Sequence, residues 1–262
     1  MYEVEFRKIF EKWFKTKNFF MEDVKKFLLD SRDDYPCYYQ DFTKEYYKDY
    51  YCSVFDASIT YYDQGRPVFY LPMFIYKSSG ENFILSTNGE FVYHPLFNKN
   101  LSKSYVKKIS SRIIGFIFDF SKSFNINNVL FYGGNEIFGG WEESVVDVSI
   151  SDNIRYKYYV DLKENILEIR SSLRESYKSL VNKSLNLFKF EVFDYCTDEL
   201  IEEFREFHFQ VSGKRTRSRQ SWKIQQDQVN SSGGFIIKIS DKSDAFIGFS
   251  LFLYSKFEGM YA

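Results

Sequence analysis

The order of strand-like and helix-like segments recurs in the two halves of this chain, and that recurrence restricts the fold more than any other feature. In the second half, the hydrophobic pattern predicts a strand over 188–193, helices over 198–211 and 221–229, and antiparallel strands over 235–239, 245–254 and 257–262. In the first half, helical patterns over 4–14 and 21–29 precede strands over 51–62, 67–76 and 82–86. These patterns predict an α/β (α+β) fold with mixed, mainly antiparallel sheets flanked by helices.

The first half contains the clearest local signals. A turn sequence at 63–66 separates two strand patterns, which predicts a β-hairpin. Ser102 is a favourable N-cap for a long helix. The expected buried stripe of that helix contains Val106, Ile109, Ile113, Phe116, Ile117 and Phe120. A short buried strand over 128–132 is expected to follow.

Another long helix is predicted near the start of the second half. After a strand over 156–160, Asp161 and Glu164 form a carboxylate variant of the capping box. The expected buried stripe of the helix contains Ile166, Ile169, Leu173, Tyr177, Leu180 and Val181. Because Arg170, Arg174 and Lys178 are four residues apart, we expect a cationic ridge on a neighbouring face, either solvated or part of a binding site.

The glycine-rich segment 133–140 is the best candidate for a boundary between domains. We therefore expect a first domain over 1–150 and a second over 151–262. The sequence ends in an apolar strand, before any counterpart of the long helix and strand that close the first half. The second domain is thus expected to be incomplete at its C-terminus.

Composition argues against several classes of protein. With 35 basic and 36 acidic residues, the chain does not resemble a protein that coats nucleic acid. Its apolar runs are shorter than the roughly 20 residues that cross a bilayer, and its N-terminus lacks a signal-peptide pattern. Three cysteines at unrelated spacings, with two histidines, predict neither a disulfide framework nor a metal cluster. We expect a cytoplasmic protein that uses no metal.

Segment 208–223, HFQVSGKRTRSRQSWK, is the strongest functional signal. It contains no carboxylate, and its five cations are Lys214, Arg215, Arg217, Arg219 and Lys223. Such a density of charge predicts a site for a phosphate, a nucleotide or a carboxylate, and the alternative is a solvated loop between helices. Arg215 and Arg217 are the best candidates to bind the anion, because a guanidinium can hold two oxygens at once.

Three neighbouring side chains complete the candidate site. The helix over 198–211 is expected to end at Gly213 and to bury one stripe: Leu200, Phe204, Phe207 and Val211. His208 falls on this apolar stripe, where it is either a core histidine or a general base. Trp222 and Gln225 share a helix face, on which Trp222 either stacks on a sugar or base, with Gln225 hydrogen-bonding it, or anchors the core. Alternative carboxylate bases are Asp56, Glu142 and Glu143.

Three stretches of the second half resemble the FemAB-type branch of the GNAT acyltransferase superfamily. LRESYKSLVNKSLNLFKFEVF is similar to the opening of a domain of that branch. EFREFHFQVSGKRTRSRQSWKIQQDQV resembles the Phe/Leu-His, Gly-Arg, Thr-Arg-Ser, Trp, Gln string of FemAB-like transferases of surface-polysaccharide loci. GFIIKISDKSDAFIGFSLFLYSKFEGMYA looks like their central antiparallel strands. The likeness covers roughly the last hundred residues, and the first half in outline.

The resemblance implies tandem GNAT-like domains. It also implies that the strand at Tyr261 supplies amides that polarise the donor carbonyl. In that superfamily, the phosphates of the donor bind at the start of a helix after the fourth strand. The sequence ends before such a helix, so we expect the second domain to lack a complete donor site.

The leading hypothesis is an acyl or aminoacyl transferase that acts on an amino group of a nucleotide-linked sugar or a cell-envelope or surface-polysaccharide precursor. His208 or a bound water would take the proton, while Arg215 and Arg217 would hold phosphates of the acceptor. The donor is acyl-CoA or aminoacyl-tRNA, and the near-zero net charge favours acyl-CoA. The alternatives are a non-catalytic module that binds a phosphorylated glycan or RNA through 213–223, and a first domain that serves only as a scaffold.

Overall fold

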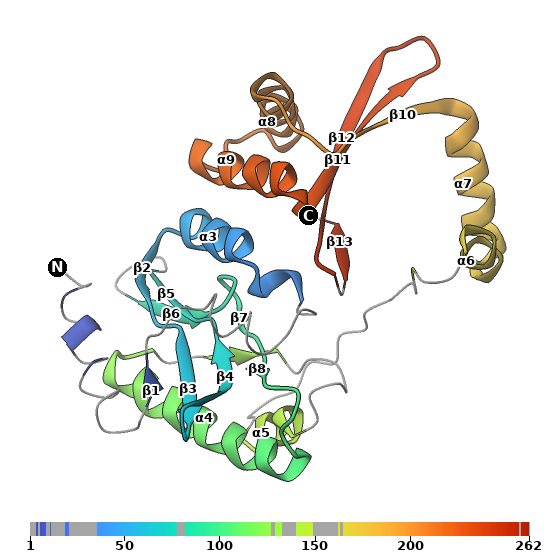
Figure 1. The fold of residues 1–262 in the computed structure, drawn as a ribbon. Helices are drawn as coiled ribbons and strands as arrows, with labels where there is room; N and C mark the ends of the chain where they lie inside the picture. Colours follow the sequence, from blue (N-terminus) through green and yellow to red (C-terminus); the bar gives the residue numbers. More distant parts are fainter. Residues whose placement is uncertain are drawn as a thin grey trace.

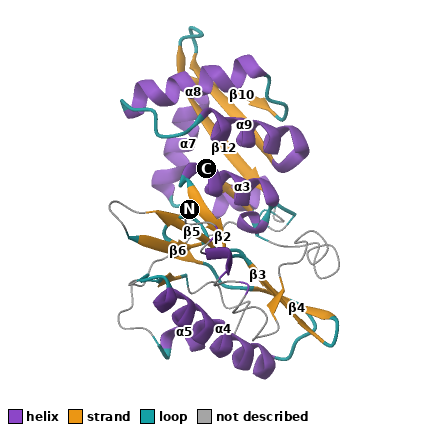
Figure 2. Ribbon diagram, turned by 90° about the vertical axis from the view of Figure 1, so that its left-hand side faces the viewer, coloured by secondary structure: helices purple, strands orange, loops and turns teal. Residues whose placement is uncertain are grey.

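The structure is a computed structural model that describes residues 4, 6–8, 11, 19–20, 36–77, 82–126, 129–132, 140–148, 162, 165–256 and 258–261. Within these residues the fold is mixed α/β with mainly antiparallel sheets, as predicted. One large hydrophobic cluster lies between Phe6 and Val145, and another lies between Cys196 and Leu253. The elements of the second half lie above those of the first in Figures 1 and 2. None of the described helices is both long enough and apolar enough to span a membrane.

The described strands of the first half form small sheets. They are β1 (Phe19–Phe20), β2 (Ser53–Asp56), β3 (Ile59–Asp63), β4 (Arg66–Leu71), β5 (Phe74–Lys77), β6 (Phe83–Ser86), β7 (Phe91–Val92), β8 (Leu96–Phe97) and β9 (Leu130–Phe131). The sheet orders are β1-β3-β4-β8, β2-β5-β6 and β7-β9. Only β7 and β9 pair in parallel among the described strands.

The predicted hairpin at 63–66 is confirmed. Asp63 of β3 pairs with Arg66 of β4. Between them, Gln64 and Gly65 have φ angles of 50° and 75°. A positive φ at both central positions is typical of the type I′ turn, whose twist matches that of the flanking strands.

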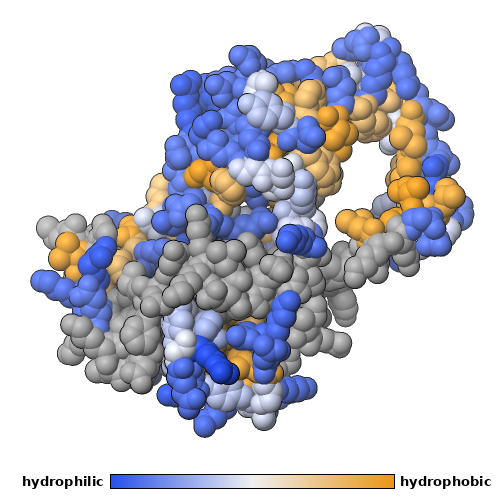
Figure 3. Space-filling view, in the orientation of Figure 1, coloured by the Kyte–Doolittle hydropathy of each residue, from blue (hydrophilic) through white to orange (hydrophobic). Residues whose placement is uncertain are grey.

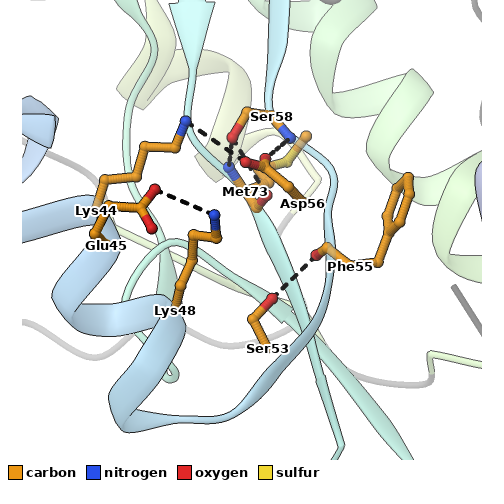
Figure 4. A network of polar contacts seen from close by, with 8 residues as sticks. All are labelled: Lys44, Glu45, Lys48, Ser53, Phe55, Asp56, Ser58 and Met73. Carbon is orange, nitrogen blue, oxygen red and sulfur yellow. Dashed lines mark hydrogen bonds and ion pairs between the residues drawn. The ribbon is translucent and has the colours of Figure 1, made fainter. Parts of the chain in front are cut away.

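The predicted continuous strands 51–62 and 67–76 are wrong, because each is divided between two sheets. The break in the first lies at Ser58, whose amide donates to Asp56 Oδ1 over 3.0 Å and whose Oγ accepts from the Met73 amide over 3.3 Å (Figure 4). The break in the second includes Pro72, which has no amide hydrogen to continue a ladder. Side-chain oxygens thus replace ladder bonds where both strands bend.

Helix α4 (Lys103–Ser123) forms the centre of the first core. Ser102 Oγ accepts from the Tyr105 amide over 3.3 Å, as expected of an N-cap. All six residues of the predicted stripe are buried. Helix α5 (Trp141–Val146) packs beside α4, and Trp141 is fully buried against Phe131. The predicted strand near 130 exists as β9, but Leu130 is 52% exposed, so the prediction that the strand is buried is wrong.

The second half matches the predicted order of elements. Strands β10 (Phe188–Phe193), β11 (Gly234–Asp241), β12 (Phe246–Tyr254) and β13 (Gly259–Tyr261) form an antiparallel sheet in that order. Helices α8 (Asp198–Ser212) and α9 (Arg219–Gln228) cover one face (Figure 1). Gly213, at φ 68°, ends α8 as predicted. Val211 is 71% exposed, so its predicted inward position is wrong.

The predicted continuous helix after residue 165 is wrong. The chain forms α6 (Ile166–Ser172) and α7 (Glu175–Leu187), because Leu173 and Arg174 adopt extended backbone. Neither helix contains a buried residue among those described, so the predicted buried stripe is wrong as well. Asn165 caps α6, whereas the predicted capping box and the strand over 156–160 lie outside the described residues. Arg174 precedes α7, and the break between the helices removes the predicted cationic ridge.

The two halves meet along α3 (Asp41–Tyr50), which follows the short helix η1 (Cys37–Tyr39) and packs along α9. Gln40 Nε2 donates to the Tyr254 carbonyl over 3.1 Å, and the Cys37 amide donates to Glu258 Oε1 over 3.1 Å. Much of this contact is therefore polar. The predicted helix over 21–29 and most of the predicted boundary segment lie outside the described residues.

Candidate functional site

Four of the predicted site residues come together where the halves meet. His208 comes from α8, Arg217 from the loop that follows, and Trp222 and Gln225 from α9. Tyr46 of α3 joins them from the first half. We call these five residues the seam cluster. Its position depends on Gly213, whose left-handed conformation turns the chain between the two helices.

Trp222 connects the seam cluster to the second core. Only 3% of its surface is exposed, and its ring lies 5.2 Å from that of Phe204. The His208 ring lies 5.5 Å from Trp222 in an edge arrangement at 73°. Trp222 therefore anchors the core, as one of the two interpretations predicted, and also sets the position of His208.

Arg217 is held by side chains from both halves. Its Cζ lies 5.0 Å from the centroid of the Trp222 ring and 5.8 Å from that of Tyr46. Its Nη1 donates to Gln225 Oε1 over 3.1 Å, and Gln225 is buried. These cation–π and hydrogen-bond contacts orient the guanidinium at the junction. Arg217 thus has a structural role that the sequence alone does not indicate.

His208 is partly buried, and its environment favours the neutral imidazole. Burial lowers the pKa of His208, and the positive charge of Arg217 lowers it further. A neutral imidazole carries a free lone pair that accepts a proton. His208 therefore has the protonation state that a general base requires at neutral pH.

Asp49 of α3 fixes the start of α9. Its Oδ2 accepts hydrogen bonds from the hydroxyls of Ser218 and Ser221, the second over 2.5 Å. Ser218 is the N-cap and accepts from the Ser221 amide over 2.9 Å. A carboxylate is favourable at this end of a helix because of the helix dipole. Sequence reasoning missed both Asp49 and Tyr46, because they lie in the Tyr-rich segment 38–51, where no local pattern distinguishes them from their neighbours.

Carboxylates of α8 and α9 partly neutralise three cations of segment 208–223: Arg215, Arg219 and Lys223. Arg215 Nη2 lies 3.6 Å from Glu206 Oε1, and Arg219 Nη2 lies 3.9 Å from Glu202 Oε1. Lys223 Nζ lies 3.2 Å from Asp227 Oδ1. Carboxylates outside segment 208–223 therefore compensate part of its positive charge, although 60% of the Arg215 side chain stays exposed. Lys214 is also exposed, at the start of the loop.

No protein-family model matches this chain, and no curated protein matches its sequence. The FemAB-type resemblance therefore stays a prediction. The functional argument rests on the geometry of the seam cluster.

The remaining predicted site residues lie elsewhere. Arg174 is exposed at the N-terminus of α7. The main chain of Tyr261, in β13, pairs with that of Phe252 in β12. None of the contacts described for these two residues reaches the seam cluster. Two of the alternative bases have ion-pair partners in the first half: Asp56 lies 3.5 Å from Lys44, and Glu143 lies 2.7 Å from Lys107.

Burial raises the pKa of Glu142, the remaining alternative base. It belongs to α5, in the first half. None of the contacts described for Glu142 involves His208. His208 is therefore the candidate base that the geometry favours.

Proposed function

We propose that this chain is an acyl or aminoacyl transferase that modifies an amino group of a nucleotide-linked sugar or a cell-envelope or surface-polysaccharide precursor. The observation that carries the proposal is the His208 imidazole, kept neutral by burial and by Arg217 where the two halves meet. The order of strand, two helices and three antiparallel strands from β10 to β13 agrees with what the FemAB-type resemblance implies.

In the proposed reaction, the acceptor amine attacks the carbonyl carbon of the donor. The new C–N bond forms as the amine proton passes to His208, and collapse of the tetrahedral intermediate breaks the bond to the leaving group. The leaving group is the thiolate of coenzyme A or the ribose oxygen of tRNA, and it takes up the proton. The imidazole returns to its neutral form.

Arg215 and Lys214 would bind phosphates of the acceptor, and their exposure in the loop that also contains Arg217 supports this role. An incoming phosphate would compete with Glu206 for Arg215. Arg217, Trp222 and Gln225 would position His208. The contribution of amides near Tyr261 stays a prediction, as does a cytoplasmic location, which the odd number of cysteines favours.

Thiol release tests the proposal directly. The full chain is incubated with acetyl-CoA and a nucleotide-linked aminosugar, and free thiol is measured. We expect His208→Gln to lower kcat/KM by about 10²- to 10⁴-fold. Arg215→Ala should raise KM for the acceptor, while Arg66→Ala, an exposed arginine of the first-half hairpin, should change neither parameter. Full activity of His208→Gln would contradict the assigned base.

The alternative is a binding module for RNA or a phosphorylated glycan. The exposed Arg219, with 83% of its side chain accessible, favours this function together with Lys214. Calorimetry with acetyl-CoA and with short RNA separates the two. Binding of RNA alone, with affinity falling steeply as salt rises, would reject acyl transfer from coenzyme A. A parallel assay with aminoacyl-tRNA tests the second donor.

A further inference from the structure

Among the described strands, β10 lies at an edge of the second sheet. The order of these strands places it outermost, and it pairs with β11. Three consecutive residues are exposed: Phe190 at 42%, Glu191, and Val192 at 63%. In a strand covered on one face, exposure alternates, so this pattern means that both faces near the edge are accessible. An open apolar edge is a template for pairing with another strand.

The helix that leads into β10 is apolar and exposed as well. Tyr177 and Leu180 are each 57% exposed, and Leu185 and Leu187 are 51% and 46% exposed. Figure 3 shows hydrophobic surface on the side of α6 and α7 that faces the sheet, and on the neighbouring strands. Apolar surface that is continuous over several elements marks an interaction site.

We propose that a second copy of this chain binds here, with the two β10 strands paired antiparallel about a twofold axis. Each interface residue would then meet its symmetry counterpart, as in other isologous dimers. Directly opposite residues in a sheet point to the same face. A twofold axis perpendicular to the sheet therefore requires a register centred on one residue.

The charges of β10 select that residue. When the axis passes through Phe190, Lys189 lies opposite Glu191 of the second copy, and this pair occurs twice. Phe188 then lies opposite Val192 of the second copy. Centring on Lys189 or on Glu191 would place two like charges opposite each other, which is unfavourable. Charge complementarity thus favours a second copy of the chain in one register.

The contacts within one chain agree with this register. Glu191 lies opposite Lys238 of β11, whose Nζ is 2.6 Å from Glu203 of α8. Lys189 of the second copy would approach Glu191 from the other side and extend a row of alternating charge. Lys189 now contacts Asp244 at the tip of the β11–β12 turn, and 41% of its side chain is exposed. Its ammonium group is therefore accessible to a second partner.

Charge reversal and charge exchange test the register. Molecular mass is measured by sedimentation over a wide range of protein concentration. Lys189→Glu or Glu191→Lys alone should raise the dissociation constant of the dimer about tenfold or more, and the double exchange should restore it. Lys108→Glu, on the exposed side of α4, is the matched control. Melting curves must show that each variant is folded.

Cysteine crosslinking gives a second test that does not depend on charge. At the centre of the register, the Cα atoms of the two copies of Phe190 lie within disulfide range, whereas those of the two copies of Val192 would be about 14 Å apart. In a Cys52→Ser background, Phe190→Cys should form a dimer on oxidation, and Val192→Cys should not. A chain that is monomeric at every concentration would overturn the proposal. So would a dimer that neither charge reversal weakens, or equal crosslinking at the two positions.

Discussion

The Asp49 carboxylate accepts a hydrogen bond of 2.5 Å from the Ser221 hydroxyl, although 172 positions separate the two residues. The same oxygen accepts from Ser218, the N-cap of α9. One side chain of the first half therefore completes the end of a helix in the second. Because α9 also contains Trp222 and Gln225, this bond helps to fix the seam cluster.

Asp49→Ala should weaken the contact between the halves. We expect a loss of about 1 to 2 kcal/mol in the free energy of unfolding, because two hydroxyl donors at a helix N-terminus lose their acceptor. Urea denaturation measures the loss. Asp119→Ala, at an exposed position of α4, is the control. A double-mutant cycle with Ser221→Ala should show coupling, and purely additive effects would contradict the assigned contact.

Arg217→Gln should raise the pKa of His208. The positive charge of Arg217 and burial both lower that pKa, and the variant removes the first cause. NMR titration of the imidazole protons in the wild type and the variant measures the change without any substrate. Arg66→Gln, in the distant hairpin, should leave the His208 pKa unchanged. An unchanged pKa in Arg217→Gln would show that burial alone sets it.

The same shift predicts how stability depends on pH. Because folding lowers the His208 pKa below its usual 6.5, the folded state holds the proton less tightly than the unfolded state. The contribution of His208 to the free energy of unfolding is fully present above pH 6.5, and it is lost as the pH falls through the pKa that His208 has in the folded state. His208→Gln should flatten this part of the curve of unfolding free energy against pH. A curve that keeps its slope would assign the effect to another group.

The three cysteines should differ widely in reactivity. Burial raises the pKa values of Cys37 and Cys196 to about 11, with nearby carboxylates adding to the effect, so few thiolates form at pH 8. Cys52 is exposed. A thiol reagent should modify one thiol of the native protein rapidly, and Cys52→Ser should abolish this rapid reaction. Denaturation should make the thiols of Cys37 and Cys196 reactive as well. Rapid labelling of Cys37 would show that the contact with Glu258 opens in solution.

The first-half hairpin offers a stabilising substitution. Gln64 adopts a φ of 50°, a conformation that side chains with a Cβ seldom adopt. Gln64→Gly should raise the free energy of unfolding by a few tenths to about 1 kcal/mol. Gly65→Ala, at φ 75°, should lower it by about 1 kcal/mol. Thermal melts of the wild type and the two variants measure these changes. Equal melting temperatures for all three proteins would argue against the type I′ turn.

Several elements could be predicted because their signals are local. Ser102 as a cap, the buried stripe of α4 and Gly213 as a helix end each depend on residues within a few turns of one another. The predicted buried stripe over 166–181 failed because periodicity identifies an apolar side without showing whether anything covers it. No glycine or proline lies at or beside Leu173 and Arg174 that would indicate the break between α6 and α7.

The candidate site, too, was predictable only where its signals are local in the sequence. The sequence alone indicated that His208, Trp222 and Gln225 could share one place, because helix spacing puts Trp222 and Gln225 on one face and Gly213 ends the preceding helix, which contains His208. Only the tertiary structure decided that Arg217 lies between Tyr46 and Trp222 and that Asp49 caps α9. Such contacts join residues far apart in the chain. Their free energy depends on how two separately formed surfaces fit together, which hydrophobic periodicity and charge counts do not encode.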